Sequence, residues 1–216
     1  MSYSTSDTSG AFRVASATEG YDKGVEDLVA IQGFGAGVLL VVADGAGGSG
    51  CGRLAAEAVV DHARQCLAGA RDAENPASWA QCLKEVDEAL LKGGSGGETT
   101  AVVLTITDRG IAGASSGDSG AWLITEAGRV DLTRHQRRKP LIGSGEALPV
   151  AFADADFRGV LLMASDGLFK YAPPGRICEV ALTTRLEDTP RRLIDLVRMP
   201  SGGLQDDVGL ILAARK

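Results

Sequence analysis

Apolar residues in the first part of the chain occur in short runs that end at polar or glycine-rich turns. Residues 38–43, Val-Leu-Leu-Val-Val-Ala, are continuously apolar, as is typical of a strand buried on both faces. A glycine-rich turn follows at residues 44–52. Shorter runs predict two earlier strands, at residues 12–16 and 28–32.

The spacing then changes to that of helices, and later back to that of strands. An apolar stripe over residues 53–68 predicts a helix, and Asn75-Pro76 is a typical N-cap and first-turn pair for a second helix through residue 91. Tight turns separate the strands that follow, so we expect an antiparallel meander of residues 99–107, 111–115, 121–125 and 130–133. The remaining pattern predicts an irregular basic segment (134–149), a strand (160–164), two helices (175–183 and 189–198) and a last strand (208–213).

This order of elements favours an α+β fold. Two helices, a run of strands, two helices and a closing strand do not alternate as the βαβ units of a parallel sheet do. A length of 216 residues with 44% apolar residues is enough for one well-filled domain. We expect a polar N-terminal tail over residues 1–11 and a single domain over residues 12–216.

Composition excludes several classes of function. The net charge of -6 argues against nucleic acid as the main partner, and the absence of an apolar run of ~20 residues argues against a membrane span. The four cysteines contain no C-x-x-C pair and there are only two histidines, so the sequence predicts no zinc ribbon. The polar N-terminus and the scattered cysteines favour a cytoplasmic protein.

Acidic residues recur at the ends of the predicted strands. Asp27 precedes one strand, Asp44 and Asp166 each follow a buried strand, Asp118 lies in a turn, and Asp206 precedes the last strand. If these strands lie side by side, their carboxylates converge into the oxygen ligand set that Mg²⁺ and Mn²⁺ prefer. Taken singly, Asp44 and Asp166 are more often ordinary turn residues, Asp118 is equally typical of a turn, and Asp206 fits a solvated loop end.

Five segments of the chain, taken together, resemble the motifs of the metal-dependent Ser/Thr protein phosphatases, the PPM or type 2C family. They occur in the family's order and span about residues 12–214. The segments are Val-Val-Ala-Asp44-Gly45-Ala46-Gly47-Gly48, Gly97-Glu98-Thr99-Thr100-Ala101-Val102-Val103, Ser116-Gly117-Asp118-Ser119-Gly120-Ala121, Leu162-Met163-Ala164-Ser165-Asp166-Gly167-Leu168 and Asp206-Asp207-Val208-Gly209-Leu210-Ile211. The chain is most similar to a short bacterial member with little or no flap.

The resemblance implies a four-layer α-β-β-α sandwich, with two antiparallel sheets flanked by helices. It implies that Asp44 bridges two metal ions, with Gly45 offering its backbone carbonyl, and that Asp166 and Asp206 complete the ligands of one metal. Asp27, together with Glu26, resembles the family's N-terminal acidic pair. A third, weaker metal is implied near Asp118.

The resemblance also implies a chemistry. A water bridging two Mg²⁺ or Mn²⁺ ions would hydrolyse phosphoserine or phosphothreonine, with Asp44, Asp166 and Asp206 as the catalytic carboxylates. The implied partners are a phosphorylated Ser/Thr protein and a cognate kinase, with no nucleic acid and no membrane. The alternative is a weak or inactive phosphoprotein-binding module of the same fold.

The sequence departs from the family's pattern in three places. No arginine stands before Glu26, where the family grips the substrate phosphate, and Lys23 is the candidate replacement. Ala46 cannot act as the general acid that a histidine provides in some members, and His62 lies on an apolar stripe, which predicts a packed histidine. A basic stretch that includes Arg137, Arg138 and Lys139 stands in place of the flap, as a solvated loop or as a patch that steers acidic phosphopeptides.

A nucleotide-binding domain is a further alternative. Residues 45–50 match G-x-G-x-x-G between a strand and a helix. A dinucleotide-binding unit needs a parallel strand after that helix, whereas this sequence predicts a second helix there. The motif alone therefore carries little weight.

Overall fold

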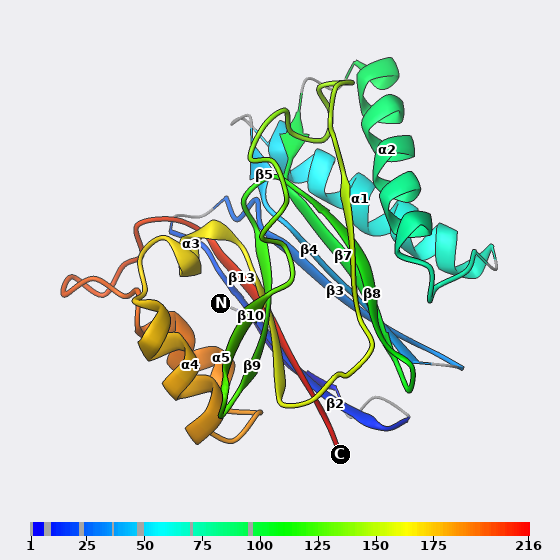
Figure 1. Ribbon diagram of the computed structural model, residues 1–216. Helices are drawn as coiled ribbons and strands as arrows, with labels where there is room; N and C mark the ends of the chain where they lie inside the picture. The colour runs from blue at the N-terminus through cyan, green and yellow to red at the C-terminus, as the bar shows by residue number, and fades with distance from the viewer. Residues whose placement is uncertain are drawn as a thin grey trace.

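A computed structural model describes the chain except for residues 1, 7–9, 22–23, 36, 47–49, 70 and 95–96, and gives the backbone alone for residues 2–6. Two antiparallel sheets pack face to face, and helices cover the outer face of each (Figure 1). The expected α-β-β-α sandwich is confirmed. Among the described residues, no helix combines the length and the apolar character needed to cross a bilayer.

Each sheet is built from strands that lie far apart in the sequence. The six-stranded sheet has the order β1 (Ser2–Ser6), β2 (Phe12–Glu19), β13 (Val208–Arg215), β12 (Val160–Ala164), β9 (Gly120–Thr125) and β10 (Gly128–Asp131). The five-stranded sheet has the order β11 (Val150–Asp154), β8 (Gly110–Ser116), β7 (Ala101–Thr107), β4 (Gly37–Ala43) and β3 (Leu28–Phe34). A small third sheet pairs β5 (Gly45–Ala46) with β6 (Glu98–Thr99).

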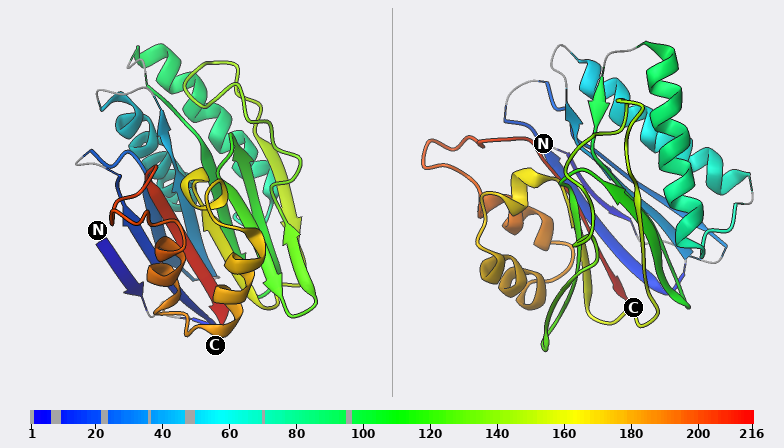
Figure 2. Two further views of the ribbon diagram at one scale, coloured as in Figure 1. Left: turned by 90° about the vertical axis from the view of Figure 1, so that its left-hand side faces the viewer. Right: turned by 45° about the horizontal axis from the view of Figure 1, so that its top comes forward.

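The helices form the two outer layers. The five-stranded sheet is covered by α1 (Cys51–Ala68) and α2 (Pro76–Gly93). The six-stranded sheet is covered by α4 (Pro174–Thr183) and α5 (Thr189–Asp195), next to the short α3 (Asp166–Phe169). Figure 2 shows these layers from two further directions.

Three apolar cores separate the four layers. Leu40, Leu104, Met163 and Ile211 are fully buried between the two sheets. The other two cores lie between each sheet and its own helices. Strands such as β4 and β7 face a core on both sides, which explains why their sequences are continuously apolar.

The start of α2 follows the sequence prediction. The Asn75 side chain accepts a hydrogen bond from the Ala77 backbone N–H at 3.0 Å, and Pro76 occupies the first turn. At the other end, Gly94 adopts the left-handed conformation with φ of 64° and donates its N–H to the Leu91 carbonyl.

The expected single meander is wrong. Strands β7 and β8 form a hairpin in one sheet, β9 and β10 form a hairpin in the other, and the turn between β8 and β9 carries the chain across. Nearly every residue of β8 and β9 is buried, so their apolar patterns fit either sheet equally well. The sequence therefore cannot show at which turn the chain changes sheets.

Two strands lie where the sequence predicts none. The segment expected as a polar tail contains β1, which pairs with β2 at the edge of its sheet (Figure 2). Between the segment expected to be irregular and the strand predicted at residues 160–164, β11 pairs with β8 as the opposite sheet's edge strand. Residues 132–149, all of which the structure describes, form turns and no helix, so no helical flap stands there.

Candidate metal centre

The predicted carboxylates meet at one end of the two sheets, where Figure 1 also places α3 and β5. Pairing of Leu28 with Ala43 brings the start of β3 to the end of β4, and with them Asp27 and Asp44. In the other sheet, the pairing of Ala164 with Leu210 brings the start of α3 to the residues before β13. The topology thus places acidic residues that are distant in the sequence in one cluster.

Asp27 is the most deeply buried member of this cluster. It is 1% exposed, and its Oδ2 has no hydrogen-bond partner within the described part of the chain. Burial raises the pKa of Asp27 to about 7, the charge of Asp207 raises it further, and a hydrogen bond from Ser165 opposes the shift. A buried carboxylate oxygen that accepts no hydrogen bond has the chemistry of a cation ligand.

Asp44 experiences the strongest repulsion. Burial raises the pKa of Asp44 to about 9, and the neighbouring charges of Asp27, Asp166 and Asp118 act in the same direction. Three of the other predicted site carboxylates are therefore close enough to act on Asp44 electrostatically.

The outer side of the cluster contains Asp166, Asp118 and Asp206. Burial raises the pKa of Asp166, and the charges of Asp118 and Asp206 add to the effect. Two cations contact this side, because Arg138 donates from Nη2 to Asp118 Oδ2 at 2.7 Å and Lys170 Nζ lies 3.7 Å from Asp206 Oδ2. The five carboxylates that the sequence singled out are thus brought together, with Asp206 linked to the rest through Asp166.

Hydrogen bonds from strand ends hold the backbone around Asp44. The Asp44 carbonyl accepts from the Thr100 N–H and from the Thr99 hydroxyl, each at 2.9 Å, and the Asp44 N–H donates to Thr100 Oγ1 at 3.2 Å. The Thr100 and Ser119 hydroxyls are 2.6 Å apart, which ties this corner to the turn that contains Asp118. The Glu-Thr-Thr segment is therefore a support for Asp44, a role that the sequence did not reveal.

Asp207 is a second residue whose function the sequence did not assign. Its Oδ1 accepts from the Tyr21 N–H at 2.9 Å and its Oδ2 accepts from the Glu26 N–H at 2.7 Å. It therefore holds the segment that presents Asp27. The adjacent pair of aspartates before β13 was the available signal, since two carboxylates at one strand end can divide ligation and support between them.

Two glycines are required by close packing at the cluster. A Cβ on Gly45 would lie 2.4 Å from the Gly52 carbonyl carbon, so β5 can approach the start of α1 only with glycine there. A Cβ on Gly167 would lie 1.9 Å from the Asp207 carbonyl oxygen. The Asp-Gly pairs are therefore fixed by contact and not only by turn preference.

The ligand chemistry of the cluster fits hard divalent cations. Its donors are carboxylate oxygens, with the Gly45 carbonyl adjacent, and oxygen donors are those that Mg²⁺ and Mn²⁺ take. Without cations, the raised pKa values show that the buried carboxylates repel one another. Lys23, the candidate phosphate-binding residue, lies outside the described residues.

A basic groove opens beside the cluster. It has a volume of about 400 Å³, and its charged lining residues are the cations Arg134, Arg138 and Lys170 and the carboxylates Asp118, Asp131 and Asp166. Arg137 and Lys139 of the basic stretch are exposed and do not line it. Lys170 was not singled out from the sequence, although its position one helical turn after Asp166 was a usable signal.

Comparison with solved structures supports the same architecture. A bacterial serine phosphatase carrying an arginine-to-alanine substitution is similar with a TM-score of 0.83 and 23% identity, covering 97% of this chain and 100% of that one. The PstP catalytic domain with two manganese ions has a TM-score of 0.77 and 21% identity, covering 94% and 97%. RsbX in complex with magnesium has a TM-score of 0.78 and 15% identity, covering 100% of both chains.

Sequence comparison alone does not reach these proteins. No protein-family model matches the chain, and no curated protein sequence matches it. The structural likeness nevertheless extends over nearly the whole length of both partners in each comparison. The chain has the fold of the bacterial PPM-type, metal-dependent Ser/Thr phosphatases.

Proposed function

We propose that this protein is a metal-dependent phosphatase acting on phosphoserine and phosphothreonine in proteins. The observation that carries the proposal is the buried pair Asp27 and Asp44, whose pKa values are raised by burial and by like charges. A cluster of this kind destabilises the fold unless cations neutralise it. The fold supports the same interpretation, because similar proteins have been crystallised with manganese and with magnesium.

In this proposal, Asp44 and the Gly45 carbonyl lie at the middle of the metal centre. Asp27, Asp166 and Asp206 are the further ligands, and Asp118 holds a third, weaker ion. Two bound divalent cations supply an acidified water as nucleophile and neutralise charge on the phosphoryl oxygens. The chain contributes by fixing these carboxylates through Asp207 and the threonines beside Asp44.

Substrate binding is assigned to the basic groove. Lys170 is the C-cap residue of the short helix α3, which begins at Asp166, and its ammonium group lies 3.7 Å from Oδ2 of the proposed metal ligand Asp206. Arg138 also lines the groove, where it pairs with Asp118. Together they supply positive charge for a phosphorylated peptide, while Lys23 remains a second candidate for contact with the phosphate.

The test is hydrolysis of phosphoserine and phosphothreonine peptides by the whole chain with Mn²⁺ or Mg²⁺. We expect activity that EDTA abolishes and that Asp44→Asn lowers by at least about 100-fold, since losing a metal ligand removes several kcal/mol of transition-state stabilisation. Asp156→Asn is the matched control, because Asp156 is an exposed carboxylate that pairs with Arg158 at the surface. A wild-type protein that binds the metal but hydrolyses neither peptide would instead support a phosphoprotein-binding module.

A further inference from the structure

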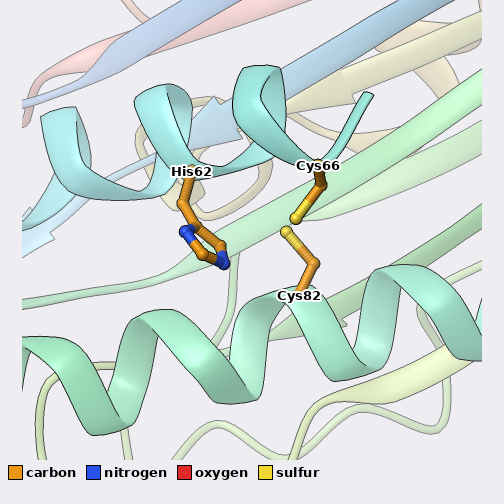
Figure 3. A group of neighbouring side chains, drawn as sticks. All are labelled: His62, Cys66 and Cys82. Atoms are coloured by element: carbon orange, nitrogen blue, oxygen red, sulfur yellow. The ribbon is translucent and has the colours of Figure 1, made fainter. Parts of the chain in front are cut away.

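A second group of metal-ligating side chains lies between α1 and α2, in the layer that covers the five-stranded sheet. His62 and Cys66 come from α1 and Cys82 comes from α2 (Figure 3). One ring nitrogen and the two sulfurs all lie within 4.8 Å of one another. The proposed phosphatase chemistry does not use these residues.

The helical repeat explains why these residues meet. His62 and Cys66 are four positions apart, so they lie on the same face of α1. The small residue Ala63, next to His62 on α1, is buried in the same apolar core as Cys82 and Val86 of α2. The sequence predicted no zinc ribbon because no C-x-x-C pair is present, but the juxtaposition of Cys66 and Cys82 depends on packing between two helices.

The burial of the group suits an ion that is held by the protein and reached from solvent. Cys66 and Cys82 are 7% and 0% exposed, whereas the His62 side chain is 30% exposed. A pocket of about 320 Å³ opens beside His62 between the two helices. An ion can therefore enter at the histidine and be retained by the sulfurs.

The polar neighbours of the group are also those of a metal site. Glu85, one turn after Cys82, has its Oε2 3.0 Å from His62 Nε2, as in the carboxylate–histidine pairs that orient metal-binding imidazoles. Arg71 donates from Nη2 to the same Glu85 oxygen at 2.9 Å and also interacts electrostatically with both thiols. Its positive charge offsets the excess negative charge that two thiolates and a carboxylate bring to a divalent ion.

Two simpler roles fit less well. A redox-active pair needs a thiol of lowered pKa, but burial raises the pKa of the Cys82 thiol, and contact with Cys66 raises it further. Plain apolar packing explains the cysteines but not the histidine and its carboxylate partner beside them. In a tetrahedral zinc site the ligand atoms are about 3.5–3.8 Å apart, which these side chains can reach by small rotations.

We propose that His62, Cys66 and Cys82 bind a thiophilic transition-metal ion, with Zn²⁺ as the first candidate and Glu85 as the partner of the imidazole. The ion would join α1 to α2 and stabilise the outer helix layer. The fourth position of a tetrahedral ion is left to water. This site is separate from the oxygen-ligand centre. A result that contradicts the phosphatase proposal therefore leaves the proposal of this second site unaffected.

Cobalt substitution tests the proposal on the whole chain after reduction and removal of metals. Thiolate ligands give Co²⁺ an intense charge-transfer absorption in the near ultraviolet, which carboxylate ligands do not give. We expect this band in the wild type and in Asp44→Asn, displacement of the band by Zn²⁺, and a rise in Tm with Zn²⁺. Cys66→Ser and Cys82→Ser should lose the band, whereas Cys178→Ser, which changes a cysteine on α4, should keep it.

His62→Ala provides a variant at a partly exposed position, which guards against misfolding of the buried cysteine variants. With its circular dichroism spectrum unchanged, it should bind Co²⁺ at least about tenfold more weakly. The proposal is overturned if the reduced wild type gives no charge-transfer band, or if the band survives in the Cys66→Ser, Cys82→Ser double variant. Ready formation of a Cys66–Cys82 disulfide in air, without metal uptake by the reduced protein, would also overturn it.

Discussion

Asp44→Asn is expected to stabilise the metal-free protein near neutral and mildly alkaline pH, although it removes a proposed metal ligand. Asparagine has nearly the shape of aspartate but carries no charge. Burial and the charges of Asp27, Asp166 and Asp118 raise the pKa of Asp44 to about 9, so the native fold opposes ionisation at this position. The substitution removes the group that must otherwise stay protonated or be neutralised.

The size and sign of the effect follow from the two protonation states. The pKa of Asp44 rises from 3.8 in the unfolded chain to about 9 in the fold, so the folded state keeps a proton that the unfolded state has lost. The contribution of these two groups to stability is therefore fully present below about pH 4 and is lost as the pH rises through about 7 for Asp27 and about 9 for Asp44. At about 1.4 kcal/mol per pKa unit the upper limit near pH 8 is on the order of 6 kcal/mol.

The measured gain in the free energy of unfolding should be smaller than this upper limit. Asp27 and Asp44 interact through a hydrogen bond, so they titrate as a coupled pair. The free-energy cost of their mutual repulsion belongs to the pair and is counted once. We expect Asp44→Asn to raise the free energy of unfolding by about 2–4 kcal/mol near pH 8 and by about 0 near pH 4.

Urea denaturation in EDTA, repeated between pH 4 and pH 9, measures this difference directly. Added Mn²⁺ should then stabilise the wild type strongly at pH 8 and leave Asp44→Asn nearly unchanged, because the variant lacks a central ligand. Asp156→Asn removes the same charge from an exposed site and should change stability by less than about 0.5 kcal/mol at every pH.

Two results would refute the reasoning. One is a wild-type-minus-variant difference that does not change with pH in EDTA. The other is an Asp44→Asn protein that is less stable than the wild type at pH 8, which would mean that the Asp44 carboxylate contributes more through hydrogen bonds than it costs through repulsion.

Three further predictions concern the surroundings of the cluster. Lys170→Ala should raise the KM for a phosphopeptide about 3- to 10-fold in low salt and less in high salt, with kcat little changed, whereas Arg176→Ala on α4 should change neither. Asp87→Ala should lower the free energy of unfolding by about 2–4 kcal/mol in urea titrations, because the buried carboxylate accepts three backbone N–H groups of the segment after β10. Gly167→Ala should cost about 1–3 kcal/mol and weaken Mn²⁺ binding measured by calorimetry, since its Cβ would collide with the Asp207 carbonyl.

Much of the fold could be predicted because its strands carry strong local signals. The strand at Val160–Ala164 was predicted with its observed bounds, and the start of α2 was fixed by the chemistry of Asn75 and Pro76. The acidic residues could be singled out because turns at strand ends place carboxylates at sheet edges. Their grouping could be anticipated from order alone, since the same strands must lie side by side to bury their apolar faces.

The missed features depend on contacts that no local pattern encodes. Edge strand β11 buries alternate residues only partly, so its signal is weak. The change of sheet after β8 depends on which of two equally apolar surfaces receives β9. The position of Lys170 beside Asp206 depends on residues that are distant in the sequence. The same holds for the approach of Cys66 to Cys82.

The arrangement of charge divides the site into two parts that should respond differently to mutation. The acidic part is buried, and backbone hydrogen bonds to Asp207 and around Asp44 fix it at the ends of strands. The basic part is exposed, and Lys170 and Arg138 pair with carboxylates at the rim of the cluster. Changes to the acidic part should therefore alter metal binding and kcat, whereas changes to the basic part should alter KM and its dependence on salt. A protein in which substitutions of these cations lowered kcat without raising KM would require Lys170 or Arg138 to act on the reacting phosphate itself.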